Sequence, residues 1–117
     1  MDPTLDTESL TPLHWLGIAA AAVTAVVHLA LGIADFPGGF GIAFLLATAG
    51  FLAGIVAVVV GYRRRLVYLL GIPFTVGQIV LWYLLNDVPP IPPIEAVDKA
   101  AQAILVAVLI VLYRRES

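Results

Sequence analysis

Residues 41–61 read GIAFLLATAGFLAGIVAVVVG, an unbroken apolar run without a charged side chain. A run of about 20 apolar residues crosses the ~30 Å hydrocarbon layer of a bilayer as a helix. Similar runs occupy residues 13–34, 66–85 and 94–113. Because these runs are continuous and do not alternate with polar residues, they exclude β-strands. The sequence therefore predicts an all-α protein with four transmembrane helices.

The composition of the whole chain agrees with a membrane protein. Of its 117 residues, 62% are hydrophobic and 12% are charged, against roughly 45–50% and about 25% in soluble domains. A soluble protein of this size has too much surface to cover with so few charges. A net charge of −2 without a basic patch argues against nucleic acid as a partner. The absence of cysteine excludes disulfides and thiolate metal sites.

The connections between the four runs are short, so consecutive helices must be antiparallel neighbours. We expect an integral membrane four-helix bundle with up-down-up-down topology over residues 13–113. A short, mobile, acidic tail (residues 1–12) precedes it and residues 114–117 follow it. Thr11 and Pro12 have the residue types of an N-cap and a first helical position.

The distribution of basic residues predicts the orientation. With four spans, both termini and the middle connection share one side of the membrane, and Lys99 is the one basic residue on the other side. The basic residues on the side of the termini are Arg63, Arg64, Arg65, Arg114 and Arg115. Short loops rich in arginine stay in the cytoplasm. We therefore expect a multi-pass protein of the cell membrane with both termini cytoplasmic.

Two halves of the chain resemble each other. Residues 15–18 (WLGI) align with residues 69–72 (LLGI), and the second and fourth runs both end in Tyr-Arg-Arg, at residues 62–64 and 113–115. A tandem repeat of two helical hairpins would give this pattern. Chance similarity among apolar helices with arginines at their inner ends would give it too.

Small residues recur on one face of the second run, where they allow close helix packing. They are Ala43, Ala47, Gly50, Gly54, Ala57 and Gly61. One interpretation packs this stripe against Gly17, Ala21 and Ala25 of the first helix. The other makes it a homo-oligomer contact, and the two can coexist.

Pro73 interrupts the third run, where it removes a backbone hydrogen bond and should kink the helix. We expect the hydroxyl of Thr75 to pair with a freed carbonyl. A static kink that improves packing is favoured over a gating hinge.

Polar side chains inside a membrane are costly, so each one is a candidate functional residue. Most of these residues fall at one depth, in the outer half of the bilayer: His28, Thr48, Gln78, Trp82, Asp98 and Gln102. Asp98 could reach His28 across the bundle and fix the tautomer of its imidazole. Glu95 and Lys99 are spaced as an i,i+4 ion pair at the start of the fourth helix.

A His28–Asp98 pair permits three interpretations. It is a structural polar clasp, part of an outward-facing site for a small ligand, proton or ion, or a haem or metal ligand through His28. The last is disfavoured because a stable metal site needs three or four ligands. His14, expected in the headgroup region beside Trp15, lies about 21 Å away along the same helix. We therefore expect no metal and no cofactor.

Several segments resemble small, uncharacterised four-helix integral membrane proteins of halophilic archaea. They are residues 62–68, 71–75, 78–83 and 93–102, with the motif Val27-His28-Leu29 and Gly32. The resemblance covers nearly all of the chain after Thr11. It implies the topology and the source, and it carries no activity with it. A low lysine content, with Lys99 as the single lysine, agrees with this source.

The chain shows no nucleophile–base arrangement and no phosphate-binding glycine loop, so catalysis is not expected. The sequence predicts a non-catalytic membrane protein that is a structural or accessory subunit or a self-assembling bundle. Its expected partners are the lipid bilayer and further copies of itself or the other subunits of a larger membrane assembly.

Overall fold

The computed structural model describes residues 7–86 and 90–116. In these residues it contains four α-helices and no β-strand, and all four helices are long and apolar enough to cross a membrane. The helices are α1 (Pro12–Asp35), α2 (Gly39–Val59), α3 (Arg64–Leu85) and α4 (Pro93–Arg115). Every helix end lies within two residues of its predicted position, which confirms the prediction of an all-α protein with four potential spans.

The beginning of α1 follows the prediction from Thr11 and Pro12. Thr11 is the N-cap, and its hydroxyl accepts a hydrogen bond from the backbone N–H of His14 at 3.4 Å. The backbone N–H of Thr11 donates in return to Nδ1 of His14 at 3.0 Å. This reciprocal pair satisfies two donors that a helix start otherwise leaves free. Leu10 packs on the core, so this part of the expected mobile tail is anchored, whereas residues 1–6 lie outside the described residues.

The end of α2 is decided by Gly61. Its φ of 73° lies in the left-handed region, which glycine adopts at little cost. The N–H of Tyr62 donates to the carbonyl of Ala57 at 2.8 Å, and the N–H of Gly61 to that of Val58 at 3.2 Å. This is a Schellman motif. Gly61 is exposed and ends the helix, so it does not pack against α1.

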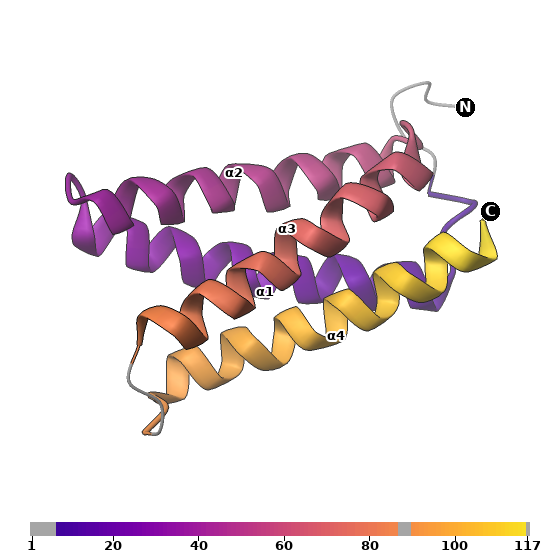
Figure 1. Ribbon diagram of the computed structural model, residues 1–117. Coiled ribbons are helices and arrows are strands. Elements are labelled where there is room, and N and C mark those ends of the chain that lie inside the picture. Colours follow the sequence, from indigo (N-terminus) through magenta and orange to yellow (C-terminus); the bar gives the residue numbers. More distant parts are fainter. Residues whose placement is uncertain (1–6, 87–89, 117) are drawn as a thin grey trace.

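The four helices are antiparallel in sequence order (Figure 1). At one end, here called the termini end, α1 begins, α4 ends and the α2–α3 connection lies (Figure 1). The α1–α2 and α3–α4 connections lie at the opposite end, the loop end. α1 packs along both α2 and α4, and α4 also packs along α3. α2 and α3 have few contacts with each other and diverge toward the loop end (Figure 1).

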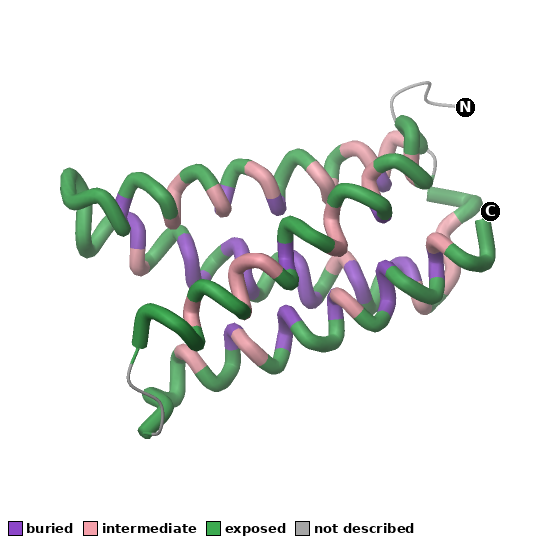
Figure 2. Tube along the Cα trace, in the orientation of Figure 1, coloured by how far each residue is buried: buried purple, intermediate pink, exposed green. Residues whose placement is uncertain are grey.

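Burial is concentrated where α1 meets α4 (Figure 2). The hydrophobic core takes Ala20, Ala21, Ala25, Leu105, Val108, Leu109 and Leu112 from these two helices, and Phe51, Val58 and Tyr68 from α2 and α3. A Cβ added to Gly17 would lie 2.9 Å from Cγ1 of Val108. The lack of a side chain at Gly17 therefore lets α4 approach α1 closely at the termini end.

The small residues of α1 and α2 do not all pack against each other as expected. A Cβ on Gly50 would lie 2.6 Å from Phe74, and one on Gly54 would lie 3.8 Å from Val67, so both glycines face α3. Gly17 faces α4. The prediction is therefore wrong for these three glycines, because small residues occur on several helix faces and do not specify a neighbour. Of the alanines in the stripe, Ala47 and Ala57 are half-buried and Ala43 is exposed.

The hydroxyl of Thr75 does not make the expected bond near Pro73. Thr75 is 1% exposed, and its Oγ1 has no hydrogen-bond partner among the described residues. Tyr68, two helical turns earlier on the same face of α3, is equally buried, and its hydroxyl interacts with the carboxylate of Glu116. The hydroxyl of Thr75 is thus left unpaired among the described residues.

Candidate functional site

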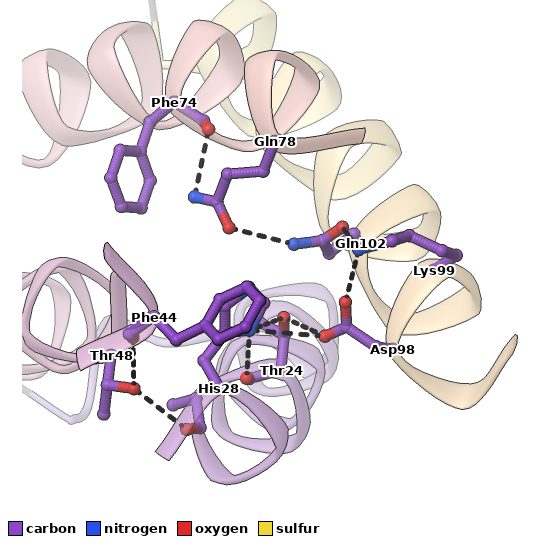
Figure 3. Close-up of polar contacts among 10 residues, drawn as sticks. Thr24, His28, Phe44, Thr48, Phe74, Gln78, Asp98, Lys99 and Gln102 are labelled. Carbon is purple, nitrogen blue, oxygen red and sulfur yellow. Dashed lines mark hydrogen bonds and ion pairs between the residues drawn. The ribbon is translucent and has the colours of Figure 1, made fainter. Parts of the chain in front are cut away.

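Six polar side chains from three helices meet in one cluster (Figure 3). The bounds of the helices place this cluster toward the loop end. This polar cluster consists of Thr24 and His28 on α1, Gln78 on α3, and Asp98, Lys99 and Gln102 on α4. Thr24 and Gln102 are fully buried, and His28 and Asp98 are 4% and 3% exposed. The structure therefore brings together four of the six predicted site residues in one network, together with Thr24 and Lys99.

His28 is held by its own helix and by Asp98. Its Nδ1 lies 2.8 Å from the backbone carbonyl of Thr24 and 3.5 Å from Oδ1 of Asp98. Because both oxygens can accept a hydrogen bond and the carbonyl can only accept, Nδ1 must carry the proton. The rings of Phe44 and Phe51 lie 5.6 and 5.7 Å from the imidazole, between centroids. Asp98 thus approaches His28 as expected. The backbone carbonyl of Thr24, and not Asp98, makes the closest contact that orients the imidazole.

Asp98 uses both of its carboxylate oxygens. Oδ1 accepts a hydrogen bond from the hydroxyl of Thr24, and Oδ2 accepts one from Nζ of Lys99 at 2.6 Å. The Asp98 side chain is 4% exposed and that of Lys99 is 17% exposed. A buried carboxylate requires a counter-charge and hydrogen bonds to offset the loss of its hydration. Lys99 and Thr24 supply both, from α4 and α1.

Two glutamine side chains extend the network to α3. Nζ of Lys99 also donates to Oε1 of Gln102 at 3.0 Å, and Nε2 of Gln102 donates to Oε1 of Gln78 at 3.1 Å. Nε2 of Gln78 then donates to the carbonyl of Phe74 at 3.1 Å. Since an ammonium group can only donate, Lys99 determines the orientation of the first amide and hence of the second. One continuous network therefore links α1, α4 and α3.

The expected Glu95–Lys99 ion pair is not formed. Oε1 of Glu95 accepts a hydrogen bond from the indole N–H of Trp82 at 2.7 Å. Nζ of Lys99 points to Asp98 and Gln102 and lies 5.3 Å from the ring centroid of Trp82. A counter-charge is more stabilising beside the buried Asp98 than beside the half-buried Glu95, because less water screens it there. Trp82 thus borders the polar cluster.

Thr48 lies outside the network. Its hydroxyl donates to the carbonyl of Phe44 at 2.9 Å and lies 3.4 Å from that of Ala25, so it links α2 to α1 (Figure 3). Thr24, by contrast, was not among the predicted site residues. The sequence feature that points to Thr24 as a site residue is its position four residues before His28, on the same helix face. Threonine in a helix usually bonds its own backbone, so a role in binding Asp98 is not visible from sequence.

A second pair of histidine and carboxylate lies at the termini end. Nε2 of His14 is 3.2 Å from Oε2 of Glu116, and His14 is 7% exposed. His14 lies in the first turn of α1, and its side chain packs inside the bundle instead of pointing outward. Glu116 follows α4, in the segment expected to be a tail, and only the tertiary structure places it beside α1. Both pairs join α1 to α4, one near each end of their interface.

A groove and a smaller pocket adjoin the helices, and the polar cluster lines neither. The larger is a groove of about 1060 Å³ between α2 and α3, and the smaller, of about 300 Å³, lies at the termini end beside His14 and Glu116. In residues 7–86 and 90–116, no three His, Asp or Glu side chains lie close enough to hold a metal ion.

Comparison with known proteins adds a family but no activity. The model of a protein family described as a "Family of unknown function (DUF7475)" matches residues 2–113. No curated protein and no solved structure matches the chain.

Proposed function

The chain belongs to that family of unknown function, and we propose that it is a non-catalytic integral membrane protein. In this proposal, α1 to α4 cross the bilayer, and the protein is a structural or accessory subunit or a self-assembling bundle. The polar cluster is a structural clasp, meaning a hydrogen-bonded network that holds three helices together without binding a ligand.

The observation that carries this proposal is the mutual pairing inside the polar cluster. Both oxygens of Asp98 are occupied, and the amides of Gln78 and Gln102 bond each other. In hydrocarbon an unpaired polar group is costly, and hydrogen bonds between helices stabilise their association. A network whose groups satisfy one another, and which lines neither cavity, is suited to holding helices together.

The placement of charge supports a membrane-spanning arrangement with both termini in the cytoplasm. The connection at the termini end contains Arg63, and the end of α4 carries Arg114 and Arg115. Lys99 lies near the loop end. Positively charged short connections favour the cytoplasmic side.

The unequal burial of the helices supports a further partner. Within their most apolar windows, 17% of α2 and 11% of α3 are buried, against 44% of α1 and 39% of α4. The outer surfaces of α2 and α3 are therefore available to another subunit, a second copy of the chain or lipid.

Single cysteines would test the location and the orientation, because the native chain has none. Glu8→Cys reports on the termini end and Gly39→Cys on the loop end, where a Cβ meets nothing within 4 Å. A membrane-impermeant thiol reagent should label Gly39→Cys on intact cells and Glu8→Cys only after lysis. The reverse pattern contradicts the orientation, and recovery of the protein without detergent contradicts the membrane location.

His28→Ala would test the structural clasp. We expect a lower unfolding temperature in detergent and weaker assembly, with no proton or ion flux through liposomes containing the native protein or the variant. Phe44→Leu is a matched control, because it alters packing on the same imidazole and leaves the hydrogen bonds in place. A flux through the native protein that His28→Ala removes would contradict the clasp.

Proton, ion or small-ligand transfer through His28, Gln78, Asp98 and Gln102 is the second candidate. The partly exposed Lys99 favours it, since Lys99 and Asp98 connect the surface to His28. A pH-sensitive dye inside liposomes would report proton entry, which Asp98→Asn should abolish. A haem or metal carried by His28 would appear in the absorption spectrum and in elemental analysis of the purified protein.

A further inference from the structure

The groove between α2 and α3 lies in the half of the bundle toward the termini end. Gly50 and Gly54 line it from α2, Val67 and Phe74 line it from α3, and Tyr62 and Arg63 line its end at the α2–α3 connection. Apart from this end, the lining is predominantly apolar. At the end of the groove away from the α2–α3 connection, the ring of Phe74 packs against Gly50, where an added Cβ would lie 2.6 Å from the ring.

The length of the groove corresponds to one leaflet of a bilayer. From Gly50 to the end of α2 at Val59 the helix rises about 14 Å at 1.5 Å per residue. Half of the ~30 Å hydrocarbon layer is about 15 Å. An acyl chain that enters at the connection would therefore reach its end near Gly50 and Phe74.

Arg63 gives the groove a cationic entrance. Its guanidinium carbon lies 5.5 Å from the ring centroid of Tyr62, and Arg63 forms no ion pair with a described residue. The neighbouring arginines are engaged elsewhere: Arg64 donates to the carbonyl of Val58 at 2.9 Å, and Arg65 donates to the hydroxyl of Tyr113 at 3.3 Å. A cation at the depth of the headgroups attracts anionic lipid.

We propose that the groove binds one anionic phospholipid, with an acyl chain between α2 and α3 and the phosphate on Arg63. This inference rests on the proposed membrane location. A lipid chain fits better than a helix of a second copy, because a helix is about 10–12 Å wide. The contact between Gly50 and Phe74 closes the groove near the middle of α2, so the groove is too short for a helix that crosses the whole membrane.

Native mass spectrometry of the detergent-purified full chain would test the proposal. The probes are phosphatidylglycerol and phosphatidylcholine with identical acyl chains. We expect one bound phosphatidylglycerol, preferred about five-fold over phosphatidylcholine. Arg63→Gln should remove this preference, and the matched control Arg65→Gln should retain it because Arg65 does not line the groove. Gly54→Leu should lower the binding of both lipids, whereas Ala49→Leu, on an exposed face of α2, should not.

Three results would overturn the lipid site. The first is equal binding of both phospholipids to the native protein, and the second is an equal loss in Arg63→Gln and Arg65→Gln. The third is efficient disulfide cross-linking of two chains through Gly54→Cys, which would place a second copy in the groove. If the protein requires detergent but gives one of these results, only the proposed lipid site is contradicted. If the protein is soluble without detergent, the proposed function as a membrane protein is contradicted as well.

Discussion

Thr24 on α1 and Thr75 on α3 are both buried threonines, 0% and 1% exposed, yet their hydroxyls have opposite environments. At the α1–α4 interface, the hydroxyl of Thr24 bonds the carboxylate of Asp98. Beside the groove, the hydroxyl of Thr75 has no partner among the described residues. The α1–α4 interface thus satisfies its polar groups, and the region around the groove does not.

Gly17 and Gly54 differ in the room that they leave for a side chain. Gly17 at the α1–α4 interface leaves no room for a methyl group, since a Cβ would lie 2.9 Å from Val108. Gly54 beside the groove does have room, at 3.8 Å from Val67. Gly50, also beside the groove, has no more room than Gly17, since a Cβ would lie 2.6 Å from Phe74. The two regions differ in helix contact, because α1 packs along α4 whereas α2 and α3 have few contacts with each other.

Asp98→Ala should have the largest effect at the α1–α4 interface. It leaves Lys99 without its counter-charge and Thr24 without its acceptor, so we expect a loss of about 3 kcal/mol in unfolding free energy. Unfolding in mixed micelles, followed by circular dichroism, would measure it. Asp98→Leu combined with Lys99→Met should recover much of the loss, and Glu95→Ala should cost less than about 1 kcal/mol. Equal losses for Asp98→Ala and Glu95→Ala would contradict the central position of Asp98.

Thr24→Val should have the next largest effect on the free energy of unfolding. It keeps the shape of the side chain and removes the donor to Oδ1 of Asp98, which costs about 1–2 kcal/mol. The same micelle titration would detect this change. Thr24→Ser, which keeps the hydroxyl, serves as the control and should lose less. If serine and valine are equally destabilising, the hydrogen bond to Asp98 contributes nothing measurable.

Alanine at the two glycines should act in opposite directions. Gly17→Ala forces Val108 to move and should cost about 1 kcal/mol. Gly54→Ala meets no obstacle and should stabilise α2 by about 0.5 kcal/mol, because alanine loses less backbone entropy than glycine. Thermal unfolding of both variants would measure the difference, and a change of the same sign in both would remove this contrast between the two regions.

Thr75→Val should have the smallest effect. Replacing a buried, unpaired hydroxyl by a methyl group removes a desolvation cost, so stability should stay constant or rise by up to about 1 kcal/mol. Both variants replace a buried threonine by valine, so the difference between their losses in stability, measured in the same detergent, reports the hydrogen bond from Thr24 to Asp98. A clear loss of stability in Thr75→Val would show that its hydroxyl has a partner.

Much of the local structure was predictable from the sequence. The four helices lie within two residues of their predicted bounds, because each is a long apolar run between polar or proline-containing breaks. The N-cap at Thr11 was predictable for the same local reason. The approach of Asp98 to His28 was also foreseen, since both residues lie at the same depth in their helices.

The neighbours of individual side chains were much less predictable. Lys99 was assigned to Glu95 by its spacing, but it pairs with Asp98. One interpretation placed Gly50 and Gly54 against α1, but they face α3. No partner was predicted for His14, and Glu116 reaches it only because α4 returns to the termini end beside α1.

By itself, the sequence determined the helical class, the number of long apolar helices and the depth at which polar residues occur. These properties depend on hydrophobicity and spacing along one helix, which are local. Only the tertiary structure decided that α1 and α4 form the core, that α2 and α3 diverge, and that Thr24 and Lys99 complete the network around Asp98. The rotation of each helix about its axis depends on the packing of all four helices together, and no single helix specifies it.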